Sequence, residues 1–270
     1  IIEELKSAGH SVIYISHKLE EVFHIADQIT VLRDGEMIQS LKKEKTNKDE
    51  IIALMVGRSL DSRFPKREAI DKNTVFEIQG FSKTKHFKAI NFDLRKGEII
   101  GFYGLVGSGR TELACSIIGY LTPDSGKMNV GGKPVKIKSP KQAISHRIGY
   151  LSEDRKNISM LPNFSIKENI TISSLKKYAR FGFINQHQEK KSANDFFNKL
   201  KINANSLNQN ITSLSGGNQQ KAFLARIIAV DPQIMILDEP TIGIDVGAKY
   251  EIYALMDQLT KKGTSIILIS

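Results

Sequence analysis

Residues 104–111 combine glycines, a basic side chain and a hydroxyl in a spacing that suits phosphate binding. They follow a short apolar run and precede an apolar helical segment. Glycines let the backbone curl so that N–H groups and a helix N-terminus point at phosphate oxygens. Arginine stands where the usual pattern has a compact lysine, so it departs from the ordinary loop. We predict that the phosphates are bound by Gly104, Leu105, Val106, Gly107, Ser108, Gly109, Arg110 and Thr111.

Two acids follow an apolar run at 234–237, which we expect to be a buried strand. Such a strand delivers Asp238 and Glu239 to the carboxyl edge of a parallel sheet, where α/β proteins bind ligands. Asp238 and the hydroxyl of Thr111 are the predicted Mg²⁺ ligands, and Glu239 is placed to polarise an attacking water. From the residues alone, two solvated acids at a strand end remain an alternative.

A second glycine motif precedes the helical run expected at 222–230. It reads Leu-Ser-Gly-Gly-Asn-Gln-Gln-Lys over residues 214–221. Ser215, Gly216 and Gly217 can expose backbone N–H groups at a helix start, which makes a second cradle for an anion.

The elements that must position these motifs indicate an α/β fold. Hydrophobic patterning predicts strands at 28–32, 36–41, 75–78, 90–94 and 99–103, and helices at 18–26, 48–56 and 110–119. Residues 58–73 are polar and charged and contain Pro65, which is typical of a linker. We therefore expect one domain at 1–57, the linker at 58–73, and a second domain at 74–270.

The two ends of the chain carry an internal repeat. Residues 9–16 and 263–270 share five of eight residues, each with a glycine before an apolar, β-branched run. Such a run is typical of a buried parallel strand. Chance similarity between two α/β units is one explanation. The other is a tandem duplication, of which the chain holds the end of one copy and nearly all of the next.

Composition sets the broad class. The chain has 39 Lys and Arg, 29 Asp and Glu, a net charge of +10, and 40% hydrophobic residues, as in ordinary globular proteins. Its lysines are interrupted by acids, so we expect no nucleic-acid partner. No run is long enough to span a bilayer and no leader pattern is present. With one cysteine, Cys115, which we expect to be a small packed residue, there is no internal disulfide, and an intracellular setting is expected.

Together these motifs resemble the ATP-binding cassette (ABC) ATPases. The Leu-Ser-Gly-Gly-x-Gln signature, 24 residues before Asp-Glu-Pro-Thr, carries the likeness. The Gly-Arg-Thr loop, the extended signature, and the run Ser152-Glu153-Asp154-Arg155-Lys156 narrow it to tandem ATPase subunits of bacterial monosaccharide importers of the ribose, galactose and xylose types. Tyr14-Ile15-Ser16-His17-Lys18 is similar to the switch-histidine loop of a first cassette. The resemblance covers essentially the whole chain.

The resemblance implies a P-loop NTPase core of ABC type, an antiparallel β portion at 74–103 and a helical subdomain inserted at about 155–225. Residues 161–207 of that subdomain would meet the membrane subunits. Residues 1–57 would end the first cassette, and 74–270 would be the second cassette, truncated before its switch loop. The two cassettes of such a protein pair head to tail, so each nucleotide lies between one P-loop and the opposite signature.

Roles follow from the resemblance, residue by residue. His17 would contact the γ-phosphate in the first cassette's site, which Ser215, Gly216, Gly217 and Gln219 would close from the opposite side. The loop 104–111, Glu153, Asp238 and Glu239 would form the other site, where Arg110 and Glu153 depart from the common pattern and suggest a degenerate site. Asp245 is similar to the aspartate that crosses between sites. Phe87 is the nearest aromatic for stacking adenine.

The implied function is ATP-driven monosaccharide uptake with ATP and Mg²⁺. The implied partners are membrane permease subunits, a periplasmic or lipoprotein sugar-binding protein acting through the complex, and the first cassette of the same chain. The implied place is the cytoplasmic face of the cell membrane, as a peripheral protein. One rival is a soluble tandem ABC ATPase of translation or DNA repair, for which 58–73 is too short a linker. A non-catalytic regulatory cassette is another.

Overall fold

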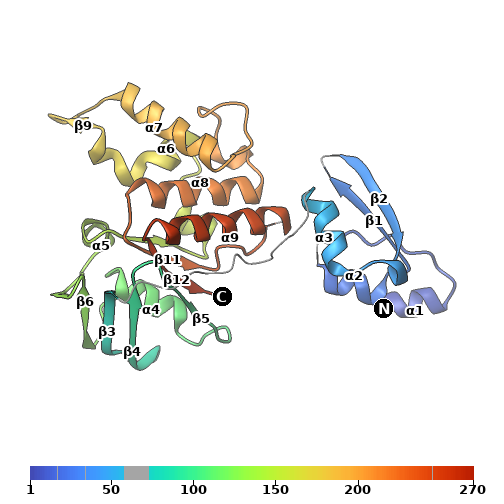
Figure 1. Ribbon diagram of the computed structural model, residues 1–270, viewed down its shortest axis with the longest axis horizontal. Coiled ribbons are helices and arrows are strands. Elements are labelled where there is room, and N and C mark those ends of the chain that lie inside the picture. Colours follow the sequence, from blue (N-terminus) through green and yellow to red (C-terminus); the bar gives the residue numbers. More distant parts are fainter. Residues whose placement is uncertain (17, 34, 58–72, 245) are drawn as a thin grey trace. The chain divides into compact units, whose positions relative to one another are not determined.

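The computed structural model describes residues 1–270 except 17, 34, 58–72 and 245. The chain divides into two compact units (Figure 1). The smaller comprises Ile1–Lys66 with Ile244–Tyr253, and the larger comprises Arg67–Gly243 with Ala254–Ser270. Of the linker predicted at 58–73, only Asn73 is among the described residues.

The N-terminal part of the smaller unit is a β-hairpin with helices. In chain order its elements are α1 (Ile2–Ser7), α2 (Leu19–Ile25), β1 (Gln28–Arg33), β2 (Glu36–Lys42), the 3₁₀ turn η1 (Lys43–Lys45) and α3 (Lys48–Val56). β1 and β2 pair antiparallel, as the pattern at 28–41 predicts. Asn47 caps α3 by accepting a hydrogen bond from the backbone N–H of Glu50 at 3.0 Å. Ile29, Val31 and Ile51 form a small core.

The strand expected at 11–16 is absent. These residues form neither helix nor strand, and Ile13 and Ile15 are 93% and 92% exposed. The sheet described in this unit, β1–β2, is a two-stranded antiparallel ribbon and offers them no parallel neighbour. Without such a neighbour, an apolar β-branched run has neither hydrogen-bond partners nor a surface that would bury it.

The second copy of the repeat is a strand in the middle of a parallel sheet. The order is β5-β12-β11-β8, formed by β5 (Ile99–Phe102), β8 (Ile148–Leu151), β11 (Ile234–Asp238) and β12 (Ser265–Ile269). All five residues of β11 are buried, as its apolar run predicts. The sheet thus presents the ends of β5, β8 and β11 at one edge, which is where the predicted site residues follow.

An antiparallel sheet lies next to it, in the order β4-β3-β6-β7. Its strands are β3 (Thr74–Lys83), β4 (Phe87–Arg95), β6 (Ser125–Val130) and β7 (Lys133–Val135). The antiparallel portion predicted at 74–103 needs two corrections. Strand β5 pairs with β12 in the parallel sheet, and β6–β7 join the antiparallel sheet because β6 hydrogen-bonds β3. The pairing of β6 with β3 was not predicted because the two strands lie far apart in the sequence.

Helices complete the larger unit. They are α4 (Arg110–Ile117), α5 (Pro140–Ser145), the π-helix η2 (Arg155–Ser159), α6 (Ile166–Thr171), the 3₁₀ helix η3 (Ile172–Lys177), α7 (Gln186–Lys199), the 3₁₀ turn η4 (Ile211–Ser213) and α8 (Gly216–Ala229). Helix α9 (Val246–Lys261) precedes β12. The predicted helical insertion is found, but it also contains a hairpin, β9 (Ala179–Arg180) and β10 (Phe183–Ile184).

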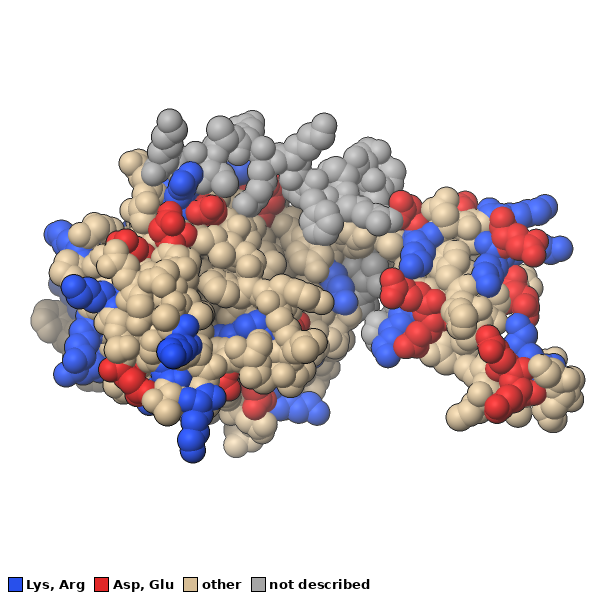
Figure 2. All heavy atoms as spheres, turned by 90° about the horizontal axis from the view of Figure 1, so that it is seen from below, with Lys and Arg blue, Asp and Glu red and all other residues tan. Residues whose placement is uncertain are grey.

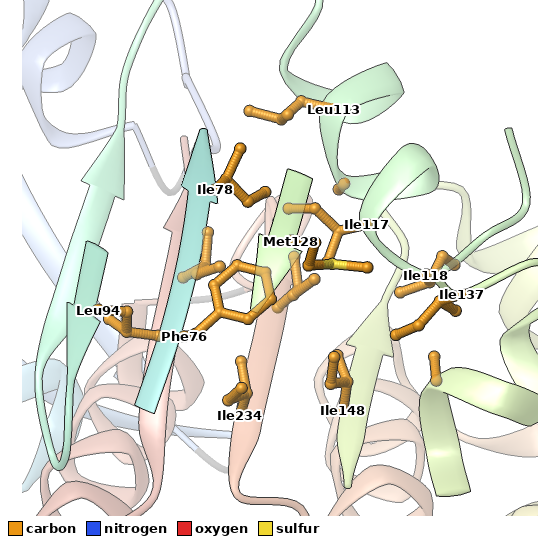
Figure 3. Close-up of a cluster of buried hydrophobic side chains, with 14 of the residues drawn as sticks. Phe76, Ile78, Leu94, Leu113, Ile117, Ile118, Met128, Ile137, Ile148 and Ile234 are labelled. Carbon is orange, nitrogen blue, oxygen red and sulfur yellow. The ribbon is translucent and has the colours of Figure 1, made fainter. Parts of the chain in front are cut away.

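The core of the larger unit joins both sheets through α4. Figure 3 shows Phe76 and Ile78 of β3 and Met128 of β6 facing Ile117 of α4, with Ile234 of β11 beside them. Ile148, Leu113 and Leu94 belong to the same buried cluster. Because α4 follows residues 104–109 directly, burying it fixes the base of that loop.

The surface carries mixed charge. On the face drawn in Figure 2, Lys and Arg side chains lie among Asp and Glu side chains rather than in one basic patch. Within the described ranges, none of the helices has both the length and the apolar character that crossing a bilayer requires.

Candidate nucleotide site

The loop between β5 and α4 turns at two glycines. Gly107 and Gly109 have φ of +83° and +87°, a region that suits glycine. A Cβ on Gly109 would also collide with the carbonyl oxygen of His86. Leu105 and Val106 are 86% and 100% exposed, so these apolar side chains do not close the loop. Residues 105–108 are exposed, whereas Gly109, the N-cap of α4, is buried. The part of the loop that is open to a phosphate is therefore 105–108.

A polar corner lies beside this loop at the end of β11. Thr111 donates a hydrogen bond from Oγ1 to Asp238 Oδ2 at 2.8 Å, and the Tyr150 hydroxyl donates to the same oxygen at 3.3 Å. Asp238 Oδ1 is buried and has no hydrogen-bond partner among the described residues. A buried carboxylate oxygen left free next to a hydroxyl fits a hard cation such as Mg²⁺.

Burial raises the pKa of Asp238, and the carboxylates of Glu153 and Glu239 raise it further, while the Thr111 hydrogen bond lowers it. The two glutamates thus lie close enough to act on Asp238 electrostatically. Glu239 has φ of +44°, an uncommon conformation for a residue with a side chain, and its N–H donates to the Ile269 carbonyl at 3.0 Å. Strain of this kind is frequent at functional sites. The structure therefore gathers Thr111, Glu153, Asp238 and Glu239 at one sheet edge.

Arg110 turns toward the end of β12. Its Nη1 donates to the backbone carbonyl of Ser270. A guanidinium engaged there contributes less to the loop than a lysine directed at the phosphates would.

The signature motif sits at the start of α8, on another part of the unit. Ser215 is exposed and is the N-cap residue, and its Oγ accepts from Asn218 Nδ2 at 3.0 Å. Gly216 and Gly217 open the helix. Gln219 donates from Nε2 to the Leu214 carbonyl at 3.1 Å, so its amide holds the motif's own loop. No hydrogen bond of the described residues joins this motif to residues 104–111.

Two residues near these motifs were missed in the sequence. Arg155 donates from Nη1 to the Gly216 carbonyl at 3.3 Å, and a Cβ on Gly243 would lie 2.8 Å from its Nη2. One guanidinium thus connects the segment after Glu153, the start of α8 and the loop after Glu239. Tyr150 supports Asp238, and burial raises its own pKa. Arg155 lies inside the 152–156 run, which was a usable signal, whereas nothing distinguished Tyr150 from a strand residue.

The aromatic proposed for adenine is partly packed. Phe87 stacks on Phe81 with ring centroids 6.3 Å apart and planes 13° apart. It also lines a hollow of about 630 Å³ that contains His86, the residue whose carbonyl contacts the loop at Gly109. The other lining residues are Ser82, Lys83, Thr84, Lys85, Lys88, Asp124 and Ser125. Cys115 is partly buried on α4, and burial raises the pKa of its thiol, in keeping with a packed residue. His17 and Asp245 lie outside the described residues.

Comparison with known proteins indicates the same family as the motifs do. A family model described as ABC transporter matches residues 87–242. The ribose import ATP-binding protein RbsA of Clostridium tetani is 45% identical over 271 residues, covering 100% of this chain and 54% of that protein. The xylose import ATP-binding protein XylG of Thermoanaerobacter pseudethanolicus is 44% identical over 278 residues, covering 100% and 55%. The chain spans about half the length of the curated relatives it matches.

Solved structures agree on the fold. A dimeric ATP-binding cassette in a post-hydrolysis state bound to ADP and phosphate has a TM-score of 0.62 at 20% identity, over 72% of this chain and 87% of that one. A cassette of an ABC transporter in its ADP conformation has a TM-score of 0.60, also at 20% identity, over 73% and 81%. The fold is thus that of an ABC ATPase cassette. Since the family model covers more than half of the sequence, the chain belongs to the ABC transporter family.

Proposed function

We propose that this chain is part of the ATP-binding subunit of an importer that drives monosaccharide uptake through membrane permease subunits. It acts at the cytoplasmic face of the membrane, and a sugar-binding protein reaches it through the complex. The relatives named for ribose and xylose import support this class of substrate. The mixed surface charge seen in Figure 2 gives no support to a nucleic-acid partner.

The observation that carries the proposal is the Thr111–Asp238 pair with its free buried oxygen. Backbone N–H groups of residues 104–111 bind the phosphates of ATP, and Thr111 and Asp238 hold Mg²⁺. That ion, when bound, neutralises charge on the phosphate oxygens. Glu239 orients and polarises the attacking water, and Glu153, which follows β8 beside β11, acts on Asp238 electrostatically.

We assign the two ends of the chain to two cassettes. Residues 1–57 end a first cassette, 58–73 link it, and 74–270 belong to a second. Ser215, Gly216, Gly217 and Gln219 then serve a second nucleotide together with His17, while Asp245 passes between sites. Two observations support this division: Ser215 is exposed, and no hydrogen bond of the described residues joins it to residues 104–111. Arg110 in place of the usual lysine supports a weaker site in this half.

The direct test is Mg²⁺-dependent ATP binding by the purified chain, measured calorimetrically with and without a chelator. Thr111→Ala and Asp238→Asn should each weaken binding in Mg²⁺ about tenfold or more, equal to about 1.4 kcal/mol, and should change binding in chelator little. Thr122→Ala and Asp195→Asn are matched controls at exposed positions. Equal affinity in all variants, or binding that ignores Mg²⁺, contradicts the proposal.

The same measurement has a pH dependence. The metal-holding form of Asp238 is the carboxylate, and burial raises the pKa of this group. Affinity in Mg²⁺ should therefore fall on acidification at a higher pH than an ordinary aspartate would give. Protonation also relieves a buried charge, so the unliganded protein should gain stability over the same interval, from the raised pKa down toward the unfolded value. Asp238→Asn should remove both effects.

A further inference from the structure

The hairpin β9–β10 ends in a turn with an unusual residue. Phe181 and Gly182 are its two central residues, with φ of +51° and +83°, and Phe183 pairs with Arg180 across it. Two-residue turns with both φ values positive favour Asn, Asp or Gly at the first position. A bulky side chain there strains the backbone. Phenylalanine stands at this tip against the local backbone preference.

The two phenylalanine side chains at the hairpin tip are exposed. Phe181 is 88% exposed and Phe183 is 80% exposed, so both rings project into solvent. Figure 1 shows the hairpin at the outer end of the helical layer of the larger unit, away from the parallel sheet. Neighbouring large apolar side chains exposed together mark interaction surfaces more often than single ones do.

The base of the hairpin is firmly held. Tyr178 is buried, its hydroxyl lies 2.7 Å from Ser192 Oγ of α7, and its carbonyl accepts from the Asn185 N–H at 2.9 Å. The tip is therefore presented by a fixed base. Folding of the base does not need the two rings, because neither ring is buried in it.

The surroundings of the tip are positive. Residues 176–195 carry five cations and two carboxylates, Glu189 and the exposed Asp195. Glu189 is buried and bound by Lys167 at 3.0 Å and Thr171 at 2.7 Å. Lys177 donates to the Ala229 carbonyl, whereas the Arg180 guanidinium lies 5.4 Å from the Phe181 ring centroid. The cations of this segment that are exposed and, among the described residues, donate no hydrogen bond to a carbonyl are Lys176, Arg180, Lys190 and Lys191, and of these Arg180 lies beside the Phe181 ring.

We propose that this hairpin inserts Phe181 and Phe183 into the headgroup region of an anionic phospholipid bilayer, with the surrounding cations on the lipid phosphates. A convex tip with two rings suits a soft, deformable surface better than a preformed protein groove. Each cation near an anionic leaflet adds a favourable electrostatic contribution, and burial of aromatic area adds a hydrophobic one. The inference concerns a surface outside the nucleotide site and does not depend on the sugar carried.

The test is co-sedimentation of the purified chain with phosphatidylcholine vesicles, with and without phosphatidylserine. Binding should require phosphatidylserine and weaken at high salt. Phe181→Gly suits the turn's positive φ, so the hairpin should keep its fold, yet binding should weaken about tenfold. Phe183→Ser and Arg180→Glu should act in the same direction. Tyr120→Ser and Lys136→Glu, at exposed positions elsewhere, are the matched controls and should bind as the parent does.

Equal binding to neutral and anionic vesicles, or binding unchanged in Phe181→Gly, overturns the proposal. If the chain ignores lipid vesicles but binds vesicles that contain permease, and Phe181→Gly abolishes this, the tip is a protein contact and the lipid assignment is wrong. ATP binding is measured on the same samples. A chain that binds ATP but no vesicles contradicts only this inference, and a chain that binds vesicles but no ATP contradicts only the proposed function.

Discussion

The segments 9–16 and 263–270 have closely similar residues and entirely different surroundings. In the second, β12 lies between β5 and β11, and Ile266, Ile267 and Ile269 are almost fully buried. In the first, alternate isoleucines face solvent. Both segments begin at a glycine with positive φ that ends a helical stretch. The local conformation at the glycine is therefore the same, and the neighbours decide whether a strand follows.

Under the proposed tandem arrangement, the different surroundings of the two segments affect the nucleotide sites next to them. β12 supplies the carbonyl of Ile269 that fixes Glu239, and Ser270 after it accepts from Arg110. The end of a properly flanked strand therefore organises the site next to it. Residues 9–16 lead toward His17 in the same way and would need flanking strands of their own cassette to do so.

Hydrogen exchange should show the largest contrast. Amides of β12 are held in two parallel ladders, so they exchange only when the larger unit opens. Amides of residues 11–16 have no ladder. Mass spectrometry of peptides covering the two segments should give rates that differ by about a thousandfold or more, as expected from typical domain stabilities. Similar rates would mean that 11–16 forms a strand in solution.

A matched pair of truncations should show the next largest effect. Ile266→Ala removes a fully buried side chain and should cost about 2–5 kcal/mol of unfolding free energy. Ile15→Ala removes an exposed one and should change it by less than about 0.5 kcal/mol. The chain has no tryptophan, so urea unfolding is followed by circular dichroism. Equal losses in the two variants would contradict the difference in burial.

Alanine substitutions at the glycines that begin segments 9–16 and 263–270 should lower the free energy of unfolding by similar amounts. Gly9 and Gly263 have φ of +84° and +90°, so alanine at either should cost about 1–2 kcal/mol. A Cβ at Gly9 meets nothing within 4 Å, and at Gly263 it meets only the flexible Lys96 side chain. Unfolding of both alanine variants should therefore show similar losses. A loss at Gly263 alone would mean that the two helix ends are not equivalent.

Patterning predicted most of the strands, and the motifs led to two side chains that the fold brings together. Thr111 was expected to bind Mg²⁺ from its place in the glycine loop, and Asp238 from its place at a strand end. Their side chains form a hydrogen bond across 127 positions of sequence, while the metal itself stays a prediction. The strand prediction within residues 9–16 was wrong. An apolar, β-branched run shows that a segment can be buried in a sheet, but it does not show whether flanking strands are present. Tyr150 was missed because its role depends on a tertiary contact to Asp238 that no spacing rule predicts. Arg155 stood in the 152–156 run, but its contact to Gly216 could not be read from that run.

The central claim, that one chain carries halves of two different nucleotide sites, is tested most directly by phosphate release at several concentrations of the 270-residue chain. Among the described residues no hydrogen bond joins Ser215 to the loop 104–111, and under the proposal Ser215 serves the other nucleotide. Turnover per chain should therefore be negligible when dilute and rise only where two chains associate. Ser215→Arg should abolish it, while Ser206→Arg, at another exposed serine, should not. Substantial turnover per chain that stays constant on dilution and survives Ser215→Arg would contradict the account.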